Sequence, residues 1–144
     1  MLRSAGVEAW AIPAFEFVNY PPRTTGDDGL LLLSHRGTKR FSQAALAAFD
    51  KQDHWVAIVG EGSPLHGRGV ITTVPQERSP VHTASHTGAM VRVAQLALAL
   101  GSPSWTGGLA GLPGAIRTAL ALRPQVIDET VAHEHRADVR SKSP

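Results

Sequence analysis

Cysteine is absent from the 144 residues of this sequence. Disulfide bonds and thiolate catalysis are therefore excluded. The chain also lacks any apolar run that approaches the ~20 residues of a membrane-spanning helix. Glu8, Pro13 and Glu16 interrupt the apolar character of the first 20 residues, so no signal peptide is predicted there. We expect a soluble cytoplasmic protein that makes no contact with a membrane.

A large excess of one charge is missing as well. Fourteen basic and twelve acidic side chains give a formal net charge of +2, and aromatic residues make up 6% of the chain. The cations are scattered among acids with few aromatic neighbours, so the sequence does not predict a nucleic-acid surface. The length fits one domain with a sizeable core.

The most informative segment is residues 29–52, where an apolar strand runs into a polar turn and then a helix. Leu30–Leu33 has no polar alternation, which is typical of a strand covered on both faces, as in a parallel sheet. The helix that follows carries apolar residues at the spacing of a core-facing stripe. Covered strands predict helices on both sides of the sheet.

The turn between this strand and helix has the composition of an anion-binding loop. Gly37 allows close backbone approach, and Thr38 is a good helix N-cap. The first amide groups of a helix lack partners and carry about half a positive charge, beside which Arg36, Lys39 and Arg40 add full charges. Alternatively, Ser34 and Thr38 merely cap the helix and the three cations are solvated.

The rest of the chain alternates strand and helix signals. Residues 54–59 predict a buried strand and residues 69–73 an edge-like one, and residues 83–100 predict a long helix ended by Gly101. The remaining expectations are the last turn of a helix over 1–5, a short strand over 7–12, a helical turn over 13–20 and two helices broken near Pro124. This order predicts a three-layer α/β sandwich with a mostly parallel sheet. A ligand site is expected beyond the strand carboxyl ends.

The order of motifs resembles the SIS (sugar isomerase) domain, and specifically the first of two such domains in glucosamine-6-phosphate synthase-like proteins. SHRGTK, residues 34–39, is similar to the family's Ser-x-Ser-Gly-x-Thr phosphate loop. PAFEFVNYPP is similar to its Ser-Glu-Phe-x-Tyr stretch, and IVGEGSPLHGRGVITTVPQE to its strand, Ser-Pro-Leu turn, strand and Pro-x-x-Glu ending. SPVHTASHTGAMVRVAQLALAL resembles the Val-Ala-x-Thr-Lys loop and the helix behind it.

This resemblance implies a flavodoxin-like or Rossmann-like SIS domain over residues 1–122, followed by a C-terminal helix and tail over 123–144. It implies binding of a phosphorylated sugar and, if the chain is an enzyme, a sugar-phosphate isomerase or isomerising aminotransferase activity. The family's first strand and second SIS domain have no counterpart here. A non-catalytic phosphosugar sensor, an assembly module, and a truncated remnant of a two-domain enzyme therefore remain alternatives.

The same resemblance supplies the site residues. It implies ligand-binding roles for residues of the phosphate loop and of the loop before the long helix. These residues are Ser34, His35, Arg36, Gly37, Thr38, Lys39, Val81 and Thr83. Arg36 and Lys39 replace hydroxyl residues of the family's loop, and an Arg fork can grip a phosphate with altered geometry or obstruct the sugar. His82 is the candidate proton carrier and Glu77 the candidate base, each with a surface or capping role as the alternative.

Neither a cofactor nor a metal is expected. His82 and His86 are four residues apart at a helix start, which is a metal-ligand spacing, but no acid completes a known pattern. The long helix at 83–100 carries apolar residues on more than one face, so one core cannot cover them all. We expect a homodimer, or a complex with another SIS protein, through the helices at 83–122 and the sheet edge left by the missing strand.

Overall fold

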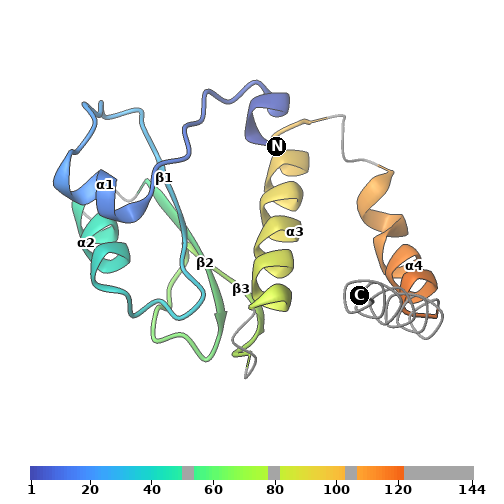
Figure 1. Ribbon diagram of the computed structural model, residues 1–144. Coiled ribbons are helices and arrows are strands. Elements are labelled where there is room, and N and C mark those ends of the chain that lie inside the picture. The colour runs from blue at the N-terminus through green and yellow to red at the C-terminus, as the bar shows by residue number, and fades with distance from the viewer. Residues whose placement is uncertain (50–53, 78–81, 103–106, 122–144) are drawn as a thin grey trace, which may run out of the picture. The chain divides into compact units, whose positions relative to one another are not determined.

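The computed structural model describes residues 1–49, 54–77, 82–102 and 107–121 (Figure 1). The chain forms two compact units, Met1–Trp105 and Thr106–Pro144. The first unit holds the sheet and every residue of the predicted site. The predicted domain boundary after residue 122 falls outside the described residues.

The first unit is an α/β structure around a small open sheet of three parallel strands. These strands are β1 (Leu30–Leu33), β2 (Trp55–Glu61) and β3 (Val70–Pro75), in the spatial order β1-β2-β3. Leu32 pairs with Ala57, and Ile58 pairs with Ile71. All three strands were predicted, and β3 is an edge strand as expected. The register shifts between Val59 and Glu61, so β2 and β3 are out of step at their carboxyl ends.

The core lies where alternate residues of β1 and β2 face the same side. Leu32, Ala57 and Val59 are buried together, and Leu46 of α2 (Arg40–Phe49) packs against them. Because successive strand residues point to opposite faces, Leu31, Leu33 and Ile58 face the other side. Ile58 is 1% exposed whereas Leu33 is 54% exposed, so this second face is covered at β2 and open at β1.

The predicted helices form with small differences. The first residues make a 3₁₀ turn, η1 (Leu2–Ala5), which ends at Gly6 with a φ of 78°, as the expected glycine stop requires. The short helix α1 (Ala14–Asn19) packs on α2 through ring contacts, with Phe15 edge-on to Phe41 at 5.2 Å. Figure 1 shows α1 and α2 on one side of the strands and the long helix α3 (Thr83–Ala99) on the other.

The strand expected over residues 7–12 does not form, and that prediction is wrong. A strand needs a neighbour to pair its backbone groups, and the ladder of the sheet contains only β1, β2 and β3 among the described residues. The carbonyl of Ala9 instead accepts a hydrogen bond of 2.9 Å from Arg3 Nε, and the Arg3 guanidinium lies 4.9 Å from the centre of the Trp10 ring. Local side-chain contacts therefore hold this segment in an irregular conformation.

In the second unit the structure describes one helix, α4 (Gly108–Ala121), which contains Pro113. The second helix expected beyond Pro124 lies outside the described residues. Across the parts of the chain that are described, none of the helices combines the length and apolar character needed to cross a membrane.

Candidate functional site

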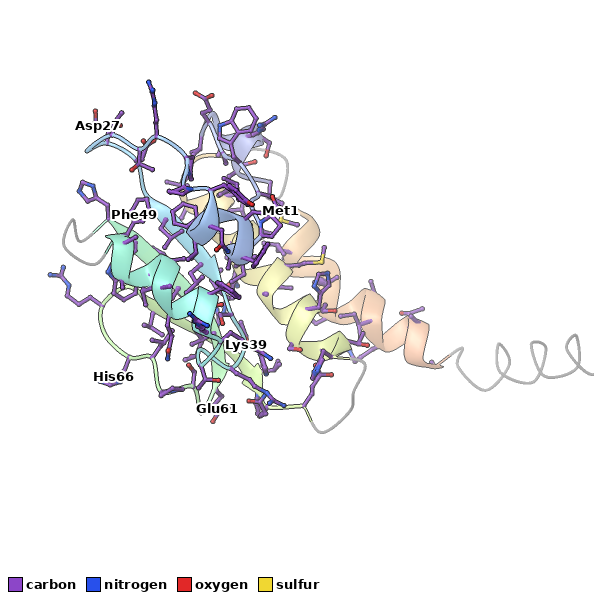
Figure 2. The ribbon with its side chains drawn as sticks, turned by 60° about the vertical axis from the view of Figure 1, so that its left-hand side comes forward. Met1, Asp27, Lys39, Phe49, Glu61 and His66 are labelled. Atoms are coloured by element: carbon purple, nitrogen blue, oxygen red, sulfur yellow. The ribbon has the colours of Figure 1, made fainter. Side chains whose placement is uncertain are left out.

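The candidate site lies at the carboxyl ends of the strands. All three strands are parallel, so the turns after β1, β2 and β3 emerge at the same edge of the sheet. Figure 2 shows Lys39, from the first turn, and Glu61, at the end of β2, at one end of the unit, with Asp27 at the opposite end. The ligand loops predicted from the sequence therefore share one edge.

The turn after β1 is packed tightly against the turn after β2. Gly37 has a φ of 68°, and its amide donates a 3.0 Å hydrogen bond to the Ser34 carbonyl. A Cβ atom at Gly37 would collide with the Ser63 hydroxyl oxygen and would lie 3.1 Å from Leu65 Cγ. Glycine is thus required here both by the backbone conformation and by the space available.

Helix α2 begins one residue later than a Thr38 N-cap predicts. The Lys39 carbonyl accepts a 3.0 Å hydrogen bond from the Gln43 amide, which makes Lys39 the N-cap residue. Within the described residues, no acceptor is found for the amides at the first three helical positions, 40–42. The open end of α2 therefore faces the edge with its partial positive charge uncompensated.

Three cations surround this open helix end. Arg36, Lys39 and Arg40 are exposed, and none of them forms an ion pair with another residue in the described ranges. The Arg40 guanidinium lies 5.9 Å from the centre of the Phe41 ring, within the range of a cation–π contact, and the side chain is exposed. The turn concentrates positive charge, and the described part of the chain supplies no counter-charge to it.

His35 lies on the opposite face of the sheet from α2, over the end of β2. Its carbonyl accepts a 2.7 Å hydrogen bond from the Gly60 amide, and its ring rests on the Gly60 Cα, where a Cβ would collide with it. The Nε2 atom is buried, and the described residues offer it no hydrogen-bond partner. Ser34 is also buried, with its amide bonded to the Ile58 carbonyl at 3.0 Å, so it continues the ladder of β1.

The N-terminus of α3 is closed by Glu77. The Glu77 carboxylate accepts hydrogen bonds from the amides of Ala84, at 2.9 Å, and Ser85, at 2.8 Å, and a third from the Ser85 hydroxyl. The Ser85 hydroxyl, followed by the Ser85 and Ala84 amides and the nearby His82, lowers the pKa of Glu77 from 4.5 to about 2. A carboxylate held this firmly in its charged form is a weak general base.

His82 is the N-cap residue of α3. It has a φ of 38°, the only positive φ among the described residues other than glycine. Its carbonyl accepts the His86 amide at 3.1 Å and lies 2.9 Å from the Ser85 hydroxyl oxygen, so backbone contacts support the left-handed conformation. The imidazole remains exposed.

The structure thus brings residues 34–39, Glu77, His82 and Thr83 to one edge, whereas Val81 lies outside the described residues. Sequence reasoning missed Gly60, Ser63 and Ser85. The first two belong to a Gly-Glu-Gly-Ser stretch directly after a buried strand, which is a visible turn signal. Ser85 stands eight residues after Glu77, a distance at which no local pattern predicts contact. The described residues contain no group of three His, Asp or Glu placed to hold a metal ion.

Comparisons with known proteins give no match: no protein-family model, no curated protein and no solved structure resembles this chain significantly. The resemblance to the SIS domain is carried by the sequence motifs alone.

Proposed function

We propose that this chain binds a phosphorylated sugar, with the phosphate at the turn between β1 and α2. One observation carries the proposal: the open N-terminus of α2 is flanked by Arg36, Lys39 and Arg40, none of which is paired within the described residues. Unpaired helix amides and cations together favour a multivalent anion. A phosphate monoester would supply charge-assisted acceptors for both.

The remainder of the ligand would lie along the same edge toward the turns after β2 and β3. Glu61 is exposed at the end of β2, and a carboxylate is a suitable acceptor for sugar hydroxyl groups. His82 presents an exposed imidazole next to the β3 turn. A phosphate at one turn and hydroxyl-binding groups at the next match a sugar phosphate better than inorganic phosphate alone.

The proposed architecture is an SIS-type, three-layer, flavodoxin-like sandwich, with a cytoplasmic location and a homodimer or a complex with another SIS protein as the working assembly. Support comes from the parallel sheet, the buried face of β1 and β2 under α2, and the order of the motifs at 34–39 and 77–83. The activity proposed for an enzyme of this type is sugar-phosphate isomerisation or isomerising amino transfer.

A non-catalytic phosphosugar-binding module is the second candidate, and the state of Glu77 favours it. Its carboxylate is engaged by three donors from α3 and has a pKa of about 2, so it is poorly suited to accept a proton from a sugar carbon. In this candidate the edge binds the ligand and the protein transmits its presence to a partner.

Calorimetry with fructose 6-phosphate, glucosamine 6-phosphate and ribose 5-phosphate tests binding. We expect Arg36→Gln to weaken binding about tenfold, since a charge-assisted hydrogen bond to phosphate contributes about 1.4 kcal/mol or more. Arg23→Gln is the matched control: it removes the same charge from the loop that leads to the amino end of β1, and should change nothing. Failure of every hexose and pentose phosphate to bind would overturn the proposal.

An isomerisation assay separates the two candidates. The purified chain is incubated with each phosphosugar that binds, and interconversion is followed by NMR. Turnover that is lost in His82→Gln, with binding retained, favours the enzyme and assigns the proton transfer to His82. Binding without turnover favours the sensor or assembly module, and turnover unchanged in His82→Gln removes His82 from the mechanism.

A further inference from the structure

The two outer edges of the sheet differ in how their backbone groups are satisfied. On β3 the Ala57 amide bonds to the Gly69 carbonyl, so in this parallel ladder residues 69, 71 and 73 face β2, and residues 70, 72 and 74 face outward. The Val70 amide bonds to the Gly67 carbonyl at 3.2 Å, and the Thr72 carbonyl accepts Arg92 Nε from α3 at 3.0 Å. The β3 edge is thereby guarded by a turn and an arginine.

In the described part of the chain, the edge of β1 has no such guard. The Leu30 amide bonds to the His54 carbonyl and the Ser34 amide to the Ile58 carbonyl, so the amides and carbonyls of Leu31 and Leu33 face outward. No described residue hydrogen-bonds to these outward groups. The strand consists of four leucines, without the charge, proline or bulge that usually protects an edge, and Leu33 is 54% exposed.

We infer that β1 is an association edge that pairs with the β1 strand of a second copy of this chain, antiparallel and centred on Leu32. In this register Leu31 lies opposite Leu33 of the other copy. In an antiparallel sheet, two residues of a hydrogen-bonded pair each donate an amide to the carbonyl of the other. The Leu31–Leu33 pair and its copy across the two-fold axis therefore form four hydrogen bonds. The two three-stranded sheets become one continuous sheet.

Two properties of the strand select this occupant. Pairing Leu33 with Leu31 of the other copy places two apolar side chains together on the face where Leu33 is exposed. The strand is also flanked by opposite charges, with Asp27 and Asp28 before it and Arg36 after it. An antiparallel copy brings the acidic end of one strand to the basic end of the other, whereas a parallel copy would place like charges together.

This inference does not depend on the identity of the ligand. Two short strands form a small interface, so the expected association is weak and reversible. Sedimentation of the purified full chain over increasing concentration should show monomers converting to dimers.

The decisive variant is Leu33→Lys, which adds a charge to the edge at an already exposed position. Met90→Lys is the matched control, because Met90 is 46% exposed but lies on α3 rather than on β1. We expect Leu33→Lys to raise the dimer dissociation constant at least tenfold and Met90→Lys to leave it unchanged. A monomer at all concentrations, or equal effects of the two variants, would overturn the inference.

The register is tested by cross-linking, because the natural chain contains no cysteine. Leu33→Cys and Met90→Cys are each treated with a short thiol-specific bifunctional reagent. In pairing centred on Leu32, Leu33 of one copy lies opposite Leu31 of the other, which is two residues from that copy's Leu33. The two Leu33 positions are therefore close, and only Leu33→Cys should form cross-linked dimers. Selective cross-linking of Met90→Cys would assign the contact to α3 instead and would also overturn the inference. This readout remains available if Leu33→Lys does not fold.

Discussion

Helices α2 and α3 begin at the same edge of the sheet, but their N-termini are in opposite states. At α3 a carboxylate from the preceding turn accepts the first amides, and its charge compensates the helix dipole. At α2 the first amides have no acceptor among the described residues, and the neighbouring side chains are cations rather than acids. One helix end is closed by its own chain, whereas the other is suited to an external anion.

This contrast shows that the side chains around a helix N-terminus, and not the N-terminus alone, decide whether it is open to an anion. Both segments contain a threonine, a histidine and a small residue close to the first turn. They differ in charge: Glu77, which follows β3, accepts the first amides of α3, whereas Arg36, Lys39 and Arg40 lie around the start of α2. A candidate anion site must therefore be judged by what already occupies it.

The largest expected effect is on the turn that leads into the open end. Gly37→Ala forces a Cβ into the Ser63 hydroxyl and into a left-handed conformation, so we expect unfolding free energy to fall by about 2 kcal/mol or more. Gly62→Ala is the control: its φ is 83°, but nothing lies within 4 Å of the added atom, so only the conformational cost of about 1 kcal/mol remains. Equal losses in urea denaturation would contradict the packing of the two turns.

The closed end is weakened by Ser85→Ala. This change removes the hydroxyl that donates to the Glu77 carboxylate and also lies within hydrogen-bond distance of the His82 carbonyl, and we expect a loss of about 1 kcal/mol in thermal or urea unfolding. Thr87→Ala, which removes a hydroxyl bonded only to the Thr83 carbonyl within the helix, should cost less. A larger loss in Thr87→Ala would show that the Glu77 contact is unimportant.

The open end can be converted into a closed one by Lys39→Asp. An aspartate at the N-cap position can accept from the first amides of α2, so we expect a gain of about 1 kcal/mol in stability together with the loss of phosphosugar binding. Lys39→Gln also removes the charge, but glutamine is a much poorer N-cap than aspartate, so this variant should weaken binding less than Lys39→Asp does. If the aspartate variant retains the affinity of the natural chain, the ligand does not use this helix end.

The smallest effect is the dependence of stability on pH. The pKa of Glu77 is lowered from 4.5 to about 2 in the folded protein, so its stabilisation is fully present above pH 4.5 and is lost as the pH falls through about 2. Glu77→Gln should therefore unfold with a shallower pH dependence between pH 4.5 and 2 and be less stable than the natural chain at neutral pH. Identical acid-unfolding profiles would contradict the closed state of α3.

The sheet and its helices were predictable because their signals are local. Runs of buried apolar residues gave β1 and β2, and the stripe of apolar residues with glycine punctuation gave α2 and α3. The strand over 7–12 failed because a strand depends on a partner, which the local pattern does not reveal. The apolar side chains in that segment are compatible with a strand and with the irregular conformation fixed by Arg3.

The candidate site was predictable in its position but not in its bonding. The order of strands and turns places residues 34–39, Glu77 and His82 at one edge, as the parallel sheet requires. Two features depend on distances between turns, which no spacing in the sequence encodes. Glu77 caps α3 and is not free for catalysis, and His35 is buried over Gly60. The assignment of a phosphosugar ligand stays a prediction for calorimetry to test.

The strand order of the sheet has a consequence for how the chain folds. Each strand pairs with the one that follows it in the sequence, so β1, α2 and β2 can assemble from fewer than forty contiguous residues before β3 is added. Short loops close at a lower entropic cost than long ones, and folds rich in local contacts reach their transition state quickly. Ser63 and Leu65, which pack against the basic turn, also lie in this contiguous stretch, so the turn's contacts need neither β3 nor α3 in order to form.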